Sequence, residues 1–171
     1  MFDNLVAEGT AEPAILVSLG LNSQNYLVYD IIGYVEENYN VYTDAAHRAL
    51  AGTLMGGIAT SNVLLDAETS GLFSAYGLFS GANKEYFEND EYVPSEEELA
   101  MLSSAHILVA SGTTDFNAFA GDNNSASMEQ VDKWLTVQDV EHGYMVNGGG
   151  HAWGSWVLAL KLFATDYLWV E

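Results

Sequence analysis

The chain has 171 residues, of which 49% are apolar and 12% aromatic, enough to bury a substantial core. We therefore expect one globular domain spanning residues 1–171. The formal net charge is −20 because only four cationic residues oppose 24 acidic ones. Such a surface repels phosphate backbones and anionic lipid, so neither a nucleic-acid partner nor a membrane-surface partner is expected. The absence of cysteine excludes disulfides, thiolate catalysis and cysteine-based metal sites.

No uninterrupted apolar run approaches the length of a membrane span. Residues 1–8 lack the basic start and apolar middle of a signal peptide. These features predict a soluble protein that is either cytoplasmic or the trimmed mature form of a secreted one, and they leave the compartment undetermined.

The first predicted element is a strand over 13–19, a short apolar run flanked by turn residues, as is typical of a buried parallel strand. Between 23 and 39 apolar residues recur at three- and four-residue spacing behind Ser23, which predicts a capped amphipathic helix. A strand over 47–52, a sharp turn and a helix over 57–66 follow.

Further along the chain, strands are expected over 72–78, 106–110 and 144–146. Helices are expected after Ser95, over 127–136 and over 153–169; three glutamates follow Ser95, where they favour the positive end of a helix. Residues 84–94 read as a solvated loop. The alternation of strands and helices predicts an α/β fold with three layers, in which helices cover both faces of a mostly parallel, roughly five-stranded sheet.

The turn after the second predicted strand reads Gly-Thr-Leu-Met-Gly-Gly over 52–57, the frame of a Gly-x-Ser-x-Gly nucleophile elbow. In that pattern the glycines let a strand turn sharply into a helix, so the central residue is thrust above the sheet edge. The central residue here is Leu54, which has no oxygen to attack a carbonyl group. Thr53 and Ser61 are nearby hydroxyls, but neither occupies the apex.

Five further segments are informative together: DNLVAEG at 3–9, YVEENY at 34–39, DAAHRALAG at 44–52, SGTTD at 111–115 and GGHAW at 149–153. In this order they resemble the α/β-hydrolase esterases that include feruloyl esterases, acetyl-xylan esterases and the esterase D and enterochelin esterase lineage. The resemblance covers nearly the whole chain. It implies an α/β-hydrolase fold and the hydrolysis of carboxylic esters.

The resemblance also implies a catalytic triad. Its serine would stand where this chain has Leu54, its acid is Asp115 and its base is His151. An imidazole must take the hydroxyl proton, and a carboxylate must fix the tautomer of the imidazole and stabilise its cation. The backbone N–H of Met55 would be one oxyanion donor. With leucine at the apex, we expect no serine-type turnover.

Other interpretations of these residues stay open. Asp115 is flanked by turn formers and could simply cap a helix. His151 could be a loop histidine packed under tryptophans. Phe116 and Trp153 lie near the expected cleft, where rings could stack on a sugar or a phenolic acyl group. The implied ligand is a small-molecule or carbohydrate-linked ester; no cofactor is implied, and no His-x-His or His-Glu-x-x-His spacing favours a metal.

The sequence departs from the family at its start. Before Phe2 there is no counterpart of the first strands, including the one whose His-Gly loop supplies an oxyanion N–H. A missing strand also belongs between 13–19 and 47–52, so these two are expected to pair directly unless another chain supplies it. The first helix is reduced to 2–8, which leaves one sheet face undercovered, so we expect an apolar patch or a homo-oligomer contact there.

Three hypotheses about function follow, of which the third is an active hydrolase that uses another nucleophile. The first is an esterase-like α/β-hydrolase related to carbohydrate and feruloyl esterases, inactive because of Leu54. The second is a non-catalytic binding or assembly protein, a pseudo-enzyme or an engineered scaffold, that uses the cleft or the uncovered sheet face. Outside the site, Arg48 is expected to pair with an acid and His47 to be structural.

Overall fold

The computed structural model describes residues 1–20, 30–122 and 124–169. Within them the strands are β1 (Ala49–Thr53), β2 (Ala75–Phe79), β3 (His106–Gly112) and β4 (His142–Asn147). The α-helices are α1 (Phe2–Ala7), α3 (Ile32–Asn38), α4 (Met55–Leu64), α5 (Lys84–Phe87), α6 (Glu96–Ser104), α7 (Phe116–Phe119), α8 (Met128–Val137) and α9 (Trp153–Asp166). Short 3₁₀ turns lie at η2 (Ala45–His47) and η3 (Ser70–Leu72).

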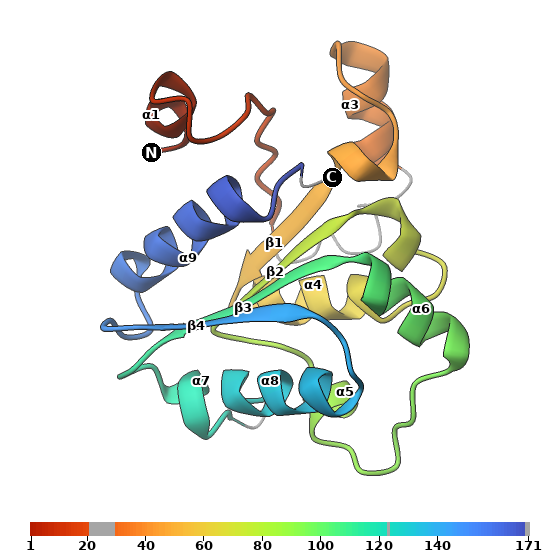
Figure 1. Ribbon diagram of the computed structural model, residues 1–171, viewed down its shortest axis with the longest axis vertical. Coiled ribbons are helices and arrows are strands. Elements are labelled where there is room, and N and C mark those ends of the chain that lie inside the picture. The colour runs from red at the N-terminus through yellow and green to blue at the C-terminus, as the bar shows by residue number, and fades with distance from the viewer. Residues whose placement is uncertain (21–29, 123, 170–171) are drawn as a thin grey trace.

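The four strands form one parallel sheet in the order β1-β2-β3-β4 (Figure 1). Thr53 at the end of β1 stands opposite Phe79, and Phe79 stands opposite Ala110. The carboxyl ends of all four strands therefore meet at one edge, where α7 and the start of α9 also lie (Figure 1). The predicted α/β class with a parallel sheet is confirmed.

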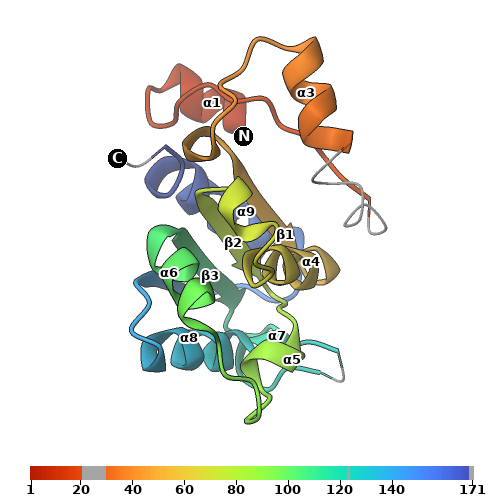
Figure 2. The same ribbon diagram turned by 90° about the vertical axis from the view of Figure 1, so that its right-hand side faces the viewer.

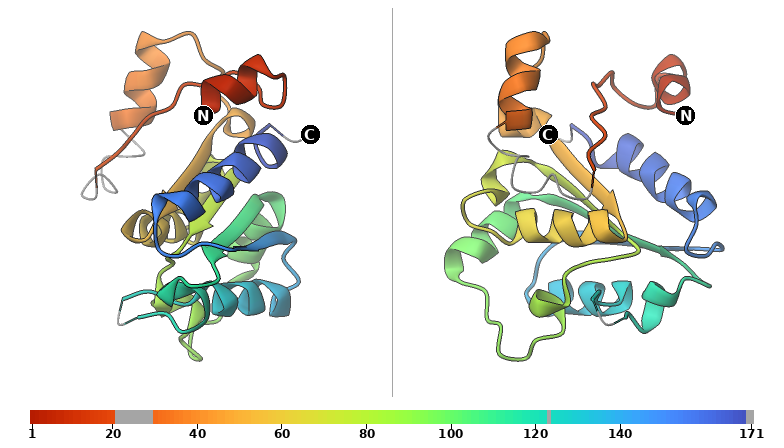
Figure 3. Two further views of the ribbon diagram at one scale, coloured as in Figure 1. Left: turned by 90° about the vertical axis from the view of Figure 1, so that its left-hand side faces the viewer. Right: turned by 180° about the vertical axis from the view of Figure 1, so that it is seen from behind.

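Helices cover both faces of the sheet, as Figures 2 and 3 show from the sides and from behind. One core cluster joins the sheet to α4, α6 and α8 through side chains such as Leu64, Leu102 and Leu135. A smaller cluster joins the other face to α9 through Ala159 and Phe163. Helix α1 packs on α9 rather than on the sheet, so the second face has the thinner cover.

The expected strand over 13–19 is wrong, and the sheet has four strands rather than five among the described residues. Leu16 is 67% exposed, and Ile15 and Val17 are nearly half exposed. The preceding residues Ala11 and Ala14 pack on the cluster between α1 and α9, which directs the segment away from β1. An apolar run becomes a strand only where a neighbouring strand accepts its hydrogen bonds.

The helix expected over 23–39 corresponds to α3, whose residues 32–38 are helical; the predicted positions 23–29 lie outside the described residues. The helices expected after Ser95 and over 127–136 are present, and each begins with a serine cap. Ser95 accepts a hydrogen bond from the Glu98 backbone N–H, and Ser127 accepts one from that of Gln130. The segment 84–94 is not entirely loop, because α5 occupies 84–87.

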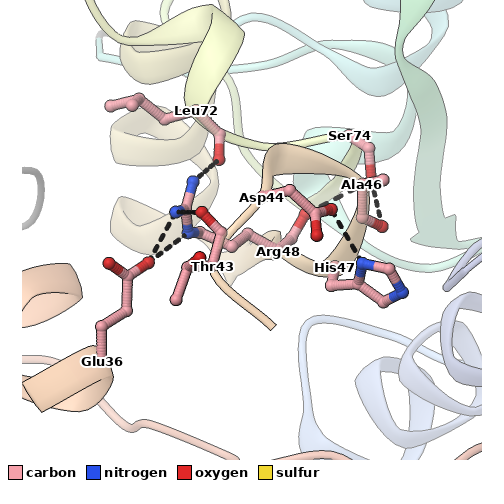
Figure 4. Close-up of polar contacts among 8 residues, drawn as sticks. All are labelled: Glu36, Thr43, Asp44, Ala46, His47, Arg48, Leu72 and Ser74. Atoms are coloured by element: carbon pink, nitrogen blue, oxygen red, sulfur yellow. Dashed lines mark hydrogen bonds and ion pairs between the residues drawn. The ribbon is translucent and has the colours of Figure 1, made fainter. Parts of the chain in front are cut away.

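A polar cluster ties α3 to the sheet (Figure 4). The Arg48 guanidinium donates to the Glu36 carboxylate at 2.5 and 3.1 Å and to the Leu72 carbonyl at 3.2 Å. The expected pairing of Arg48 with an acid is confirmed. His47 Nδ1 lies 2.7 Å from the Asp44 carboxylate, and this hydrogen bond lowers the pKa of Asp44. These contacts are structural and lie at the amino ends of the strands.

Candidate active site

Leu54 stands at the tip of a sharp turn between β1 and α4. Its φ is 51° and its ψ is −112°, a conformation that leucine rarely adopts. The turn is held by a hydrogen bond from the Leu54 N–H to the Phe79 carbonyl at 2.9 Å and one from the Ile58 N–H to the Leu54 carbonyl at 3.0 Å. The strand, strained turn and helix are the context that a nucleophile elbow requires.

The glycines around the turn allow backbone segments to touch. A Cβ atom at Gly52 would lie 2.1 Å from the backbone of Gly56, and one at Gly57 would lie 2.2 Å from the carbonyl oxygen of Gly81. A Cβ at Gly81 would in turn meet the Leu54 carbonyl oxygen at 2.4 Å. Gly52 is therefore needed for the close approach of backbone within the elbow, and Gly57 for its packing on the end of β2, whereas a Cβ at Gly56 would meet nothing within 4 Å.

Asp115 caps α7 at the carboxyl edge of the sheet. Its side chain is fully buried. Oδ1 accepts a hydrogen bond from the Asn117 backbone N–H at 2.9 Å and lies 3.0 Å from Nδ1 of His151. The two interpretations left open by the sequence, a cap and a partner of His151, are thus both realised by one oxygen atom.

His151 lies in the return between β4 and α9, with its side chain 18% exposed. The Phe116 ring lies against it at 4.3 Å between centroids, and Trp156 meets it edge-on at 5.1 Å. Because an ionised carboxylate oxygen only accepts hydrogen bonds, this contact requires the proton on Nδ1, which leaves Nε2 as the lone-pair nitrogen of a neutral ring. Nε2 is buried and has no hydrogen-bond partner within the described ranges. This imidazole is arranged to accept a proton at Nε2.

Ser80 connects these parts, and the sequence reasoning missed it. It is fully buried with a φ of 55°. Its hydroxyl accepts a hydrogen bond from Trp156 Nε1 at 2.9 Å, and its carbonyl accepts one from Asn117 Nδ2 at 2.9 Å. The next residue, Gly81, abuts the backbone of Leu54. A Ser-Gly pair directly after a predicted buried strand was the available signal.

The remaining predicted site residues surround this edge. Met55 is the first residue of α4 and 45% exposed, so its N–H precedes the first intrahelical hydrogen bond. Phe116 is 51% exposed and Trp153 is 72% exposed. Trp156 packs on the α9 core cluster. Ser61 is buried, donates to Ile58 and accepts from the Asn83 backbone N–H, so its hydroxyl is fully engaged elsewhere.

No cluster of three or more histidine, aspartate or glutamate side chains suited to a metal ion occurs within 1–20, 30–122 and 124–169. In the same ranges, no helix has the length and apolarity needed to cross a bilayer.

A parallel sheet with helices on both faces, an elbow after β1 and an acid–imidazole pair at the carboxyl edge define an α/β-hydrolase fold. Residues 2–164 match the esterase family described as "Putative esterase", and the chain belongs to that family.

Solved structures with the same fold include ferulic acid esterases. One is 21% identical, with a TM-score of 0.72, and the match covers 96% of this chain and 74% of that one. A second, from Anaeromyces mucronatus in complex with ferulic acid, is 21% identical with a TM-score of 0.72 and coverages of 97% and 69%. The enterobactin esterase from Shigella flexneri, solved in the presence of 2,3-dihydroxy-N-benzoyl-glycine, is 16% identical with a TM-score of 0.65 and coverages of 97% and 46%.

Proposed function

We propose that this protein is an esterase of the feruloyl type whose nucleophile is absent: it binds a small ester ligand at the carboxyl edge of the sheet without hydrolysing it through an acyl-enzyme. The observation that carries this proposal is the pairing of Asp115 with His151 at 3.0 Å beside an elbow whose tip is Leu54.

The chemistry of the missing step follows from the atoms present. A serine hydroxyl at position 54 would give its proton to His151 Nε2 as its oxygen attacked the ester carbonyl. Asp115 would stabilise the resulting imidazolium, and the Met55 N–H would donate to the developing oxyanion. The leucine side chain has neither a transferable proton nor a lone pair, so no acyl-enzyme forms.

Exposed rings beside the imidazole support an aromatic or sugar-linked acyl group as the ligand. Phe116 is half exposed and contacts His151, and Trp153 is largely exposed and packs against Trp156 at 5.6 Å. Two structures with this fold were solved with ferulic acid and with a dihydroxybenzoyl compound, both of which carry phenolic rings. Aromatic side chains stack on such rings.

The test compares the unmodified chain with Leu54→Ser and with Leu54→Ser/His151→Ala, using 4-nitrophenyl acetate and methyl ferulate. Removing the serine of subtilisin lowers kcat by roughly a millionfold, and one oxyanion donor is worth on the order of 10²–10³. Met55 is the one oxyanion donor that we assign, so the gain from restoring the serine should be smaller by the value of the second donor. We therefore expect kcat of Leu54→Ser to exceed that of the unmodified chain by about a thousandfold. The double variant should return to the starting rate.

Turnover by the unmodified chain that His151→Ala abolishes would contradict the proposal and indicate another nucleophile. Turnover by neither chain, with association that rises with protein concentration, would favour the second hypothesis of an assembly protein. Its interface would lie on the thinly covered face, where α9 exposes Val157 by 38% and Leu158 by 47%.

A further inference from the structure

The return between β4 and α9, which carries His151, is tied down at its base by a buried amide. Asn147 ends β4 and is 9% exposed. Its Oδ1 accepts hydrogen bonds from the Gly149 N–H at 3.0 Å and from the Ser155 hydroxyl at 2.8 Å. Its Nδ2 donates to the Ser155 carbonyl at 3.2 Å. One side chain thus joins the strand, the loop and the first turn of α9.

A second set of hydrogen bonds joins this loop to the loop that carries Asp115. The Thr113 N–H donates to the Asn147 carbonyl at 2.7 Å. Both the N–H and the hydroxyl of Thr114 donate to the Gly149 carbonyl, at 3.0 and 3.1 Å. The two loops that supply the acid and the imidazole are therefore attached to each other immediately beside those residues.

The glycines of the return make this close approach sterically possible. A Cβ at Gly112 would lie 2.1 Å from the Gly149 carbonyl oxygen. A Cβ at Gly149 would meet both the Asn147 amide oxygen and the Ser155 Cβ at 3.0 Å. Within the glycine run at 148–150, which fits no dinucleotide fingerprint, Gly149 thus has a specific use, whereas a Cβ at Gly148 would meet nothing within 4 Å. The run is also the most flexible kind of backbone, so it needs anchors to hold one conformation.

We propose that Asn147, together with Ser155, is a positioning residue that sets the imidazole of His151 against Asp115; as a statement about catalysis this rests on the proposed function. The hydrogen bond to Asp115 fixes one ring nitrogen but not the path of the loop. The N-cap residue of α9, Ala152, has no side-chain cap, so the Asn147 amide supplies the attachment at this helix start. Misplacement of a catalytic group by about 1 Å can cost 10²-fold in rate.

The first test needs no turnover. Long-range ¹H–¹⁵N spectra of the unmodified chain report which nitrogen of His151 carries the proton. We expect the Nδ1–H form alone in the unmodified chain and a mixture of tautomers in both Asn147→Ala and Ser155→Ala. Ser95→Ala is the matched control, because it removes a serine hydrogen bond at the start of a different helix, α6, and should leave the His151 spectrum unchanged.

An unchanged His151 tautomer in both site variants would overturn the proposal, as would the same mixture in the Ser95→Ala control. If Asn147→Ala fails to fold, the same tautomer measurement on Ser155→Ala and Thr114→Val decides the proposal. The latter keeps the shape of the side chain and removes only the hydroxyl bond to Gly149.

The second test measures turnover in the Leu54→Ser background. There we expect Asn147→Ala and Ser155→Ala to lower kcat by about 10- to 100-fold, with KM changed by less than about twofold, because the ligand surface is intact while the base is misplaced. Equal kcat with and without the anchors would overturn the catalytic part. An inactive Leu54→Ser chain would count against the proposed function alone, since the tautomer measurement decides the positioning role independently.

Discussion

Strand β2 and the described residues 13–20 both carry apolar patterns, but the side chains of β2 are buried, whereas those of 13–20 are largely exposed and none in α3 is buried. Every residue of β2 is buried. Leu16 is 67% exposed and Tyr34 in α3 is 60% exposed. β2 has a strand on each side and core clusters on both faces, whereas α3 contacts the rest of the fold through Ile32, which packs on the larger cluster, and through the ion pair between Glu36 and Arg48.

The difference shows that an apolar pattern indicates which side chains can be buried. Whether they are buried depends on the neighbouring strands and helices. From β2 to β4, each strand pairs with the next one along the chain, so the strands predicted from the local pattern are also found in the sheet. Around 13–19 no strand takes up the apolar run within the described part of the chain. The following substitutions test this contrast, from the largest expected effect to the smallest.

Among the substitutions outside the hydrophobic core, Gly112→Ala should be the most damaging, because its Cβ would lie 2.1 Å from the Gly149 carbonyl oxygen, where two hydrogen bonds from Thr114 hold that group. Overpacking of this kind lowers the free energy of unfolding by about 1–3 kcal/mol, and we expect the upper end. Urea denaturation followed by circular dichroism measures it. Gly71→Ala is the control, since a Cβ there meets nothing within 4 Å; equal losses would refute the close-packing argument.

Arg48→Met should remove the polar attachment of α3. Arg48 is 17% exposed at its side chain and donates to Glu36 and to the Leu72 carbonyl. Hydrogen bonds to charged groups are worth about 1.5–3 kcal/mol, so we expect a loss of about 2 kcal/mol in urea denaturation. Amide exchange of Tyr39, whose N–H bonds to Val35, should accelerate as α3 loosens.

Arg48→Lys is the matched control for that experiment, because it keeps the charge and loses the planar fork. Its free energy of unfolding should lie between that of the unmodified chain and that of Arg48→Met. Unchanged exchange at Tyr39 in Arg48→Met would mean that other contacts hold α3.

Glu98→Gln should weaken the dependence of stability on pH. The Ser95 backbone N–H, which donates to the Glu98 carboxylate at 2.6 Å, lowers the pKa of Glu98 below its ordinary value of 4.5. A lowered folded-state pKa stabilises the fold above the unfolded pKa, and this stability is lost as pH falls through the folded value. We expect less than about 1 kcal/mol, because the carboxylate is solvated.

The measurement is the difference in unfolding free energy between pH 7 and pH 3 for the unmodified chain and for Glu98→Gln. Glu97→Gln, in the same helical turn, serves as the control and should keep the original pH dependence. The explanation by the hydrogen bond between Ser95 and Glu98 fails if both substitutions reduce the pH dependence of stability equally.

Leu16→Ser should have the smallest effect, within about 0.5 kcal/mol, because the side chain is already mostly in water. The comparison is Leu102→Ala in α6, which is 1% exposed and should cost about 2–5 kcal/mol. Thermal unfolding of the two variants gives both numbers. A loss of more than about 2 kcal/mol at Leu16 would show that 13–19 is packed in solution.

Much of the fold was accessible from the sequence where the signal is local. The strands from β1 to β4 and the helices that begin at Ser95 and Ser127 lie close to their predicted positions, because apolar runs and residues that favour helix starts act within a few neighbours. The prediction for 13–19 is wrong because an apolar run has the same local pattern whether or not a neighbouring strand is there to pair with it. At the site, Asp115 and His151 were predicted as a pair, whereas Ser80 and the Asn147 anchor were not.

The sequence by itself determined the order of strands β1 to β4, the glycines of the elbow and the hydrocarbon at position 54. Only the tertiary structure decided that Oδ1 of Asp115 meets an imidazole 36 residues later, and that the hydroxyl of Ser80 receives an indole N–H 76 residues away. The physical reason is the separation along the chain over which each interaction acts. Hydrogen-bond caps and periodic burial are set by adjacent residues, whereas contacts at the sheet edge exist because parallel pairing brings the carboxyl ends of distant strands together.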